Sequence, residues 1–158
     1  MGRVAQINRS AGGVPKLAVV SAQVTTAGLS GDKQRNLKFH GGPDRALCLW
    51  SLEVIEALQA EGHPIAPGSA GENLTLAGLD WPALGPGSQL QLGDLVRVEI
   101  TDYAPPCRTI MRWFSDRRFS RISQRHYPGS SRLYARVLQV GPVTTGDRAL
   151  VVIAGIGA

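Results

Sequence analysis

The chain has 158 residues, 43% of them apolar and 18% charged, and its formal net charge is +5. These values are typical of a globular chain and exclude a disordered or collagen-like one. At this length folding buries roughly 68–70% of the surface of the unfolded chain, so we expect a single domain over residues 1–158. The longest apolar stretch, Ala149 to Ala154, is far shorter than the ~20 residues of a membrane span, and no membrane partner is predicted.

Glycine and proline are frequent, with 19 and 10 residues, which predicts many turns and few long helices. In chain order we expect strands over 3–8, 17–25 and 45–50, a helix from Ser51 to Gly62, strands over 73–76, 89–92 and 96–101, a helix over 107–114, and a closing hairpin of strands 132–140 and 147–153. Gly93-Asp94 is the expected hairpin turn between the sixth and seventh of these elements. Short strands in this succession predict a mainly β fold, a closed or nearly closed β-barrel with a few short helices.

The chain contains two cysteines, Cys48 and Cys107. The segment Met1 to Gly13 lacks the apolar core of a signal peptide. A reduced, cytoplasmic protein is therefore the expectation.

Positive charge is concentrated in the last third of the chain. Residues 1–103 hold 8 Lys and Arg against 10 Asp and Glu, whereas residues 104–158 hold 9 Arg against Asp116 and Asp147. Arginine binds phosphate and carboxylate groups with its planar fork, so this block indicates an anionic partner. A solvated basic face without a partner is an equally good interpretation of the count alone.

The two cysteines have opposite surroundings. Cys107 follows two prolines, precedes Arg108 and begins the predicted helix, a setting that favours the thiolate form. Cys48 lies in the apolar run Ala46 to Trp50, so we expect it to be buried and inert. Cys107 is therefore the candidate reactive residue.

Three polar turns lead into predicted strands and are candidate ligand-binding loops. The first is Gly31 to Gln34, the second is His40 to Asp44, and the third is Gly71 to Leu74. Glycines at such places allow backbone N–H groups to face an anion. A metal site built from protein ligands alone is not predicted, because the three histidines lack zinc-site spacing and there is no CxxC pair.

Four motifs in this order resemble a known family. They are Thr26 to Gln34, His40 to Ala46, Gly71 to Leu74, and Pro106-Cys107, with the closing segment Tyr134 to Leu138 as further support. The chain is similar to stand-alone MOSC domains (molybdenum cofactor sulfurase C-terminal) of the bacterial YiiM-like kind. The resemblance covers about Ser21 to Val152.

The resemblance implies a MOSC-type β-barrel that binds molybdenum cofactor (molybdopterin), with Cys107 as the catalytic cysteine and molybdenum ligand. It implies reduction of N-hydroxylated bases, a small-molecule substrate and an electron-donor protein; pyridoxal phosphate binding is a description attached to the family as a whole. The expected cofactor-binding residues are His40, Gly41, Gly42, Asp44, Glu72 and Asn73 for the pterin pocket, and Arg108 and Arg112 for the phosphate. Many members carry an Arg just ahead of the Pro-Cys pair, whereas this chain has Tyr103-Ala104-Pro105. Arg108 or another arginine must then take its place.

Two alternatives stay open. Cys107 could carry sulfur as a persulfide, without a substrate pocket. A barrel that binds nucleic acid through Arg117 to Arg136 is disfavoured, because this stretch has few aromatic residues for base stacking and no recognition-helix pattern. The oligomeric state is not predicted.

Overall fold

The computed structural model describes residues 1–10, 13–32 and 42–155, and it shows a β-barrel. The strands are β1 (Gly2–Arg9), β2 (Leu17–Val19), β3 (Ser21–Thr25), β4 (Gly28–Leu29), β5 (Leu47–Ser51), β6 (Leu74–Ala77), β7 (Gln89–Leu92), β8 (Val96–Ala104), β9 (Arg132–Gln139), β10 (Gly141–Thr144) and β11 (Arg148–Ile153). The described helices are α1 (Leu52–Ala60) and the 3-10 helices η1 (Pro43–Arg45), η2 (Trp81–Ala83), η3 (Arg108–Trp113) and η4 (Phe119–Ile122). None of these helices is long and apolar enough to cross a membrane.

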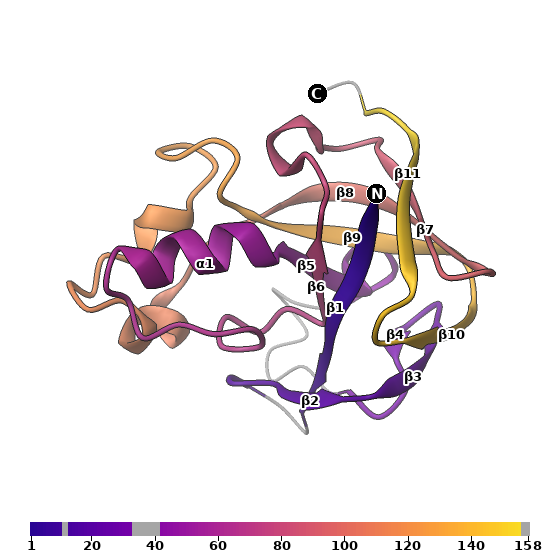
Figure 1. Cartoon of the computed structure of the whole chain (residues 1–158), viewed down its shortest axis with the longest axis horizontal. Coiled ribbons are helices and arrows are strands. Elements are labelled where there is room, and N and C mark those ends of the chain that lie inside the picture. Colours follow the sequence, from indigo (N-terminus) through magenta and orange to yellow (C-terminus); the bar gives the residue numbers. More distant parts are fainter. Residues whose placement is uncertain (11–12, 33–41, 156–158) are drawn as a thin grey trace.

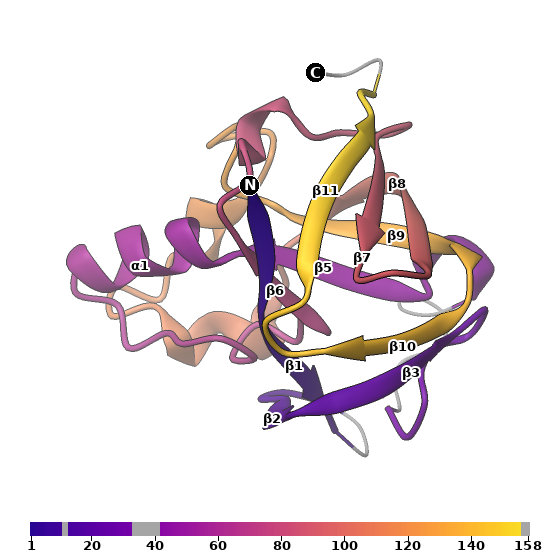
Figure 2. The same cartoon turned by 45° about the vertical axis from the view of Figure 1, so that its right-hand side comes forward.

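The larger sheet closes on itself. Its strands follow the order β11-β7-β8-β9-β5-β6-β1-β2, and a further pairing of β1 with β11 joins the seven strands from β11 to β1 into a barrel. The smaller sheet, β10-β3-β4, lies at the end of the molecule away from α1 (Figures 1 and 2). The predicted mainly β barrel is confirmed.

Alternating side chains fill the barrel. In β7 and the first part of β8 buried residues alternate with less buried neighbours: Leu90 and Leu92 in β7, and Val96, Val98 and Ile100 in β8. This period of two places one face of each strand inside the barrel. All residues of β5 are buried, on both faces of the sheet. A strand that is buried on both faces has a nearly continuous run of apolar residues, as Leu47 to Trp50 do here.

Helix α1 follows β5 as predicted. The Ser51 side chain accepts a hydrogen bond from the backbone N–H of Val54 at 3.2 Å and caps the helix. Ile55 and Leu58 are its buried residues. The helix carries the chain from β5 to β6, and these strands pair in parallel, since a crossover connection returns the chain in the same direction.

Two predictions of secondary structure are wrong, one on the extent of a strand and one on the pairing of two strands. The expected strand over 17–25 divides at the exposed Val20 into β2 and β3, which belong to different sheets. The expected hairpin of 132–140 with 147–153 does not form: β9 pairs with β8 and β5, and β11 pairs with β7 and β1. Between them, the residues expected to turn form β10, which pairs with β3 and buries Val143.

The connection from β8 to β9 lies beside α1, in orange tones in Figure 1. The helix predicted over 107–114 is the 3-10 helix η3, with Cys107 as its capping residue. Ile110 and Phe114 are buried on its inner side, while Trp113 is partly buried.

Candidate active site

Cys107 lies just beyond the end of β8. It is partly buried, and its Sγ is 2.8 Å from Oγ1 of Thr109. Cys48 is 7% exposed, and burial raises the pKa of its thiol to about 11. Cys48 is therefore a buried, protonated thiol, as predicted, and Cys107 is the accessible one. Both cysteines are free.

Arg132, the first residue of β9, joins two loops. Its guanidinium donates from Nη1 to the carbonyl of Ala70 at 2.7 Å and from Nη2 to the carbonyl of Pro105 at 3.0 Å. Ala70 precedes Glu72 by two residues, and Pro105 precedes Cys107 by two residues. Arg132 thus holds the third predicted loop against the segment that carries the cysteine.

Arg132 is buried and forms no salt bridge with a described carboxylate, although its charge acts on the buried carboxyl group of Glu72. The residue is 5% exposed, and its Nε has no hydrogen-bond partner among the described residues. A buried cation that is bonded only to neutral carbonyls creates a positive field, which favours a nearby anion.

Tyr134 connects the cysteine to the second predicted loop. Burial raises the pKa of its hydroxyl to about 12, with a smaller contribution from Cys48 and the weakest one from Cys107. The guanidinium of Arg45 lies over its ring, 4.9 Å from the centroid. Arg45 ends η1, so the turn after Gly42 approaches the same region.

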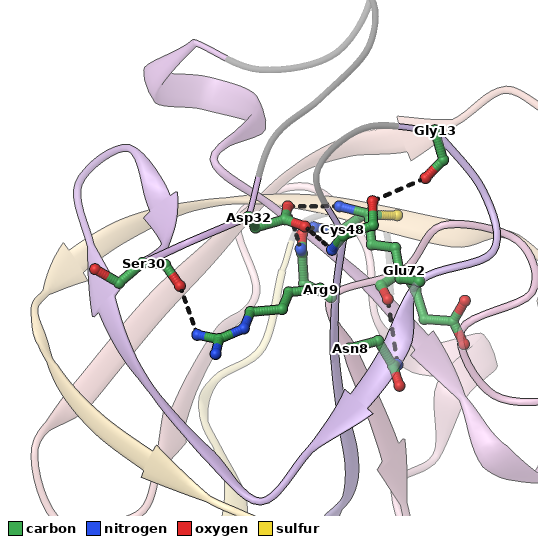
Figure 3. A network of polar contacts seen from close by, with 10 residues as sticks. Asn8, Arg9, Gly13, Ser30, Asp32, Cys48 and Glu72 are labelled. Carbon is green, nitrogen blue, oxygen red and sulfur yellow. Dashed lines mark hydrogen bonds and ion pairs between the residues drawn. The ribbon is translucent and has the colours of Figure 1, made fainter.

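A buried ion pair stabilises the other side of the site. Lys16 Nζ is 2.5 Å from Asp32 Oδ2, and the two side chains are 6% and 5% exposed. Asp32 also accepts hydrogen bonds from the backbone of Ser10 and the side chain of Asn73, both at 2.9 Å (Figure 3). Asn73 in turn accepts from the backbone N–H of Cys48 at 2.9 Å. Asn73 therefore fixes the first polar turn to β5.

Glu72 is fully buried behind this network. Its Oε2 accepts hydrogen bonds from Gly68 N at 2.9 Å and from Thr75 Oγ1 at 3.0 Å. Its Oε1 has no partner among the described residues. Burial raises the pKa of the carboxyl group. The contacts of Glu72 shape the loop that Arg132 also holds.

The described ones among the remaining predicted site residues are exposed. Asp44 is exposed, and Arg108 and Arg112 are exposed on η3. Arg112 donates to the carbonyl of Val14 at 3.4 Å, which places η3 beside the segment of Lys16. Gly42 has φ +81, and a Cβ there would meet nothing within 4 Å. His40 and Gly41 lie outside the described residues.

The structure brings together three residues that were not predicted from the sequence, namely Lys16, Arg132 and Tyr134. Lys16 is a single lysine after a proline, and no spacing rule marks it as buried. Arg132 and Tyr134 alternate with Leu133 at the start of β9, and this period-two pattern is the one signal that would have placed them on a common face.

Solved structures with the same barrel are found among bacterial proteins. YiiM from Geobacillus stearothermophilus superposes with a TM-score of 0.74 at 23% identity, over 99% of this chain and 78% of that chain. YiiM from Escherichia coli superposes with a TM-score of 0.72 at 23% identity, over 98% of this chain and 71% of that chain. The YuaD protein from Bacillus subtilis gives 0.74 at 18% identity, over 94% of both chains. At these identities the comparison shows a shared fold, a barrel of the YiiM and YuaD kind.

Sequence similarity identifies the family. The MOSC domain family matches residues 36–149. YflK of Bacillus subtilis (strain 168), an uncharacterised protein, is 32% identical over 118 residues, which are 73% of this chain and 52% of YflK. YiiM of Escherichia coli (strain K12) is 37% identical over 97 residues, 53% of this chain and 39% of YiiM. The chain belongs to the MOSC domain family, as its motifs predicted. The matched part spans about half or less of the length of these two relatives.

Proposed function

We propose that this protein binds molybdenum cofactor through Cys107 and reduces N-hydroxylated compounds in the cytoplasm. The reaction is R–NH–OH plus two electrons and two protons to R–NH₂ and water. The nitrogen–oxygen bond breaks, and the oxygen leaves as water. Membership of the MOSC family supports the cofactor, and a cytoplasmic setting suits two free cysteines.

The observation that carries the proposal is the position of the Arg132 charge. The guanidinium donates to the backbone carbonyl two residues before Cys107 and forms no salt bridge with a described carboxylate. A soft thiolate ligand beside a fixed cation fits a group that joins a thiophilic metal to an anionic pterin phosphate. Arg132 is also the arginine that can replace the one missing ahead of Pro106-Cys107.

The residues present have distinct roles in this proposal. Cys107 would ligate the molybdenum, and the exposed guanidinium groups of Arg108 and Arg112 would bind the phosphate. The bound cofactor supplies a two-electron redox centre. Asn73 and Glu72 would act indirectly, since their buried side chains hold the predicted binding loops in place. Gly42 and Asp44, with His40 and Gly41, would line the pterin.

The test is cofactor content and activity after expression in a host that makes molybdenum cofactor. We expect about one molybdenum per chain in the parent and in Cys48→Ala, and little in Cys107→Ser. A viologen-driven reduction of an N-hydroxylated purine should follow the same order. Equal molybdenum in the parent and Cys107→Ser would contradict the proposal.

The sulfur-carrier alternative gives a different result in the same samples. A persulfide adds about 32 Da to Cys107 and is removed by reductant. If the parent protein carries this adduct and contains no molybdenum, the sulfur-carrier function is supported and the reductase function is contradicted.

A further inference from the structure

The sulfur atom of Cys107 has one hydrogen-bond partner among the described residues, the hydroxyl group of Thr109. Sγ of Cys107 lies 2.8 Å from Oγ1 of Thr109. Cys107 is the N-cap residue of η3, but its side chain forms no capping hydrogen bond with the backbone of that helix. Within the described part of the chain, the contact with Thr109 is therefore the polar contact that can fix the direction of the sulfur atom.

The backbone of Cys107 is held on both sides. Ahead of it, two prolines have restricted φ angles, and the carbonyl of Pro105 accepts a hydrogen bond from Nη2 of Arg132 at 3.0 Å. Behind it, the carbonyl of Cys107 accepts from the backbone N–H of the buried Ile110 at 3.2 Å. The main freedom that remains is rotation about the Cα–Cβ bond, χ1, which has three staggered positions. A contact of the sulfur atom with Thr109 selects one of them.

Threonine is well suited to this contact. Its side chain branches at Cβ, so its own χ1 is restricted and the hydroxyl group keeps its place on η3. Thr109 lies directly before Ile110, which is buried in the hydrophobic core and anchors η3. Thr109 itself is exposed, and Sγ of Cys107 is the described hydrogen-bond partner of its side chain. The hydroxyl group therefore acts on the sulfur atom and satisfies no buried polar group.

The direction of this hydrogen bond follows from metal ligation. Either atom can be the donor while the thiol carries its proton. A cysteine that ligates a metal has lost that proton, so its sulfur atom can only accept and the hydroxyl group of Thr109 must donate. A donated hydrogen bond draws negative charge from a ligand atom and orients it toward the metal.

We propose that Thr109 is a positioning residue for Cys107: its hydroxyl group donates a hydrogen bond to the sulfur atom and holds it in the rotamer that binds the metal. This inference rests on the proposed function, in which Cys107 ligates molybdenum. Arg132 and Ile110 place the backbone of Cys107, and Thr109 places its side chain.

The test compares the parent with three variants. Thr109→Val keeps the shape of the side chain without the hydroxyl group, and Thr109→Ser keeps the hydroxyl group. Thr145→Val is the matched control, at an exposed threonine in the turn between β10 and β11. Because both threonines are exposed, the melting temperatures of all variants should stay within about 2 °C of the parent.

The first experiment uses protein without cofactor. The NMR couplings between Hα and Hβ of Cys107 report its χ1 angle. We expect a single rotamer in the parent, in Thr109→Ser and in Thr145→Val, and a mixture of rotamers in Thr109→Val. Averaged couplings in the parent, or a single rotamer in Thr109→Val, would overturn the inference.

The second experiment uses protein expressed in a host that makes molybdenum cofactor. During dialysis we expect Thr109→Val to lose molybdenum about tenfold faster than the parent, with Thr109→Ser and Thr145→Val like the parent. The midpoint potential of the bound centre should become more negative in Thr109→Val, because a sulfur atom without the hydrogen bond donates more charge to the metal. Equal rates and potentials in all four proteins would contradict the positioning role.

The two experiments separate this inference from the proposed function. A parent that contains no molybdenum contradicts the reductase, and the rotamers of Cys107 in the cofactor-free protein still decide whether Thr109 holds the sulfur atom. A parent that retains molybdenum, with Thr109→Val equal to it in rotamer, retention and potential, supports Cys107 as the ligand and removes Thr109 from the site.

Discussion

The ion pair of Lys16 with Asp32 is the most deeply buried pair of opposite charges among the described residues. Asp32 receives two further hydrogen bonds, from Ser10 N and from Asn73 Nδ2. These contacts keep the carboxylate oxygens satisfied away from water. A single change that removes one charge leaves the other buried without compensation.

We therefore expect Lys16→Met to lower the free energy of unfolding by about 3–5 kcal/mol, because Asp32 is then buried without its counterion. Urea denaturation followed by circular dichroism measures it. The double variant Lys16→Met/Asp32→Asn should recover part of this loss, since no charge is stranded. A double variant as unstable as the sum of the two single ones would mean that the charges do not interact.

Replacement by serine should change the stability of the protein differently at the two cysteines. Cys48→Ser places a hydroxyl among Ala104 and Tyr134, and we expect a cost of about 1–3 kcal/mol. Cys107→Ser changes an accessible side chain, so stability should remain within about 0.5 kcal/mol. Thiol labelling of the native parent checks the assignment: faster reaction of Cys48 than of Cys107 would reverse it.

The burial or role of a single residue can be predicted from the sequence when its neighbours along the chain determine its surroundings. Cys48 within an apolar run and Ser51 before a helix are such cases, and both predictions are confirmed. Lys16, Arg132 and Tyr134 depend on contacts with distant segments. Arg132 bonds Ala70, 62 residues away in the chain, and no local pattern contains that information.

Among the described glycines, Gly68 is the one at which an added Cβ would come nearest to another backbone. Gly68 has φ +89, and a Cβ there would lie 2.2 Å from the carbonyl oxygen of Lys16. Lys16 N donates to the carbonyl of Gly68 at 2.9 Å. A side chain at position 68 would therefore push away the segment that carries Lys16, just ahead of β2.

We expect Gly68→Ala to destabilise the protein by clearly more than the ~1 kcal/mol of an ordinary positive-φ glycine. Gly62→Ala is the matched control, since Gly62 has φ +95 and open space around a Cβ. Thermal melting of both variants gives the comparison. Equal losses at the two positions would show that the close approach to Lys16 adds nothing.

The elements themselves follow from periodicity wherever a strand has one buried face. The β7–β8 hairpin around Gly93 was predicted within a few residues, because alternation and a turn signal agree. The segment from Leu17 to Thr25 has no such alternation, and tertiary pairing decides that it becomes β2 and β3. Likewise Gly141-Pro142 carries turn residues, but pairing with β3 makes it the start of a strand.

The molecule as a whole should lose stability in alkali. Burial raises the pKa of Cys48 from 9.0 to about 11 and that of Tyr134 from 10.0 to about 12. At neutral pH both groups are protonated in the folded and unfolded states, since the ordinary pKa values are 9.0 and 10.0. As the pH rises further, the unfolded chain loses these protons first, so the free energy of unfolding falls.

The expected loss from Cys48 alone is about 3 kcal/mol between pH 9.0 and about 11, since each pH unit between the two pKa values contributes about 1.4 kcal/mol. Urea denaturation at pH values from neutral to about 11 measures it. In Cys48→Val the decline should begin about one pH unit later, because Tyr134 then titrates alone. A parent whose stability stays constant over this range would contradict the burial of both groups.

The seam between β1 and β11 has a consequence for synthesis on the ribosome. Gly2 pairs with Ala149, and a side chain at Gly2 would lie 2.8 Å from the Ala149 carbonyl oxygen. The β7–β8 hairpin and α1 can form as soon as they emerge, since their contacts are local. The N–H and C=O groups of Gly2 and Arg3 that pair with β11 stay unpaired until residue 149 has left the exit tunnel. A nascent chain stalled before that residue is an open sheet that is available to chaperones, and translation past β11 converts it into a barrel.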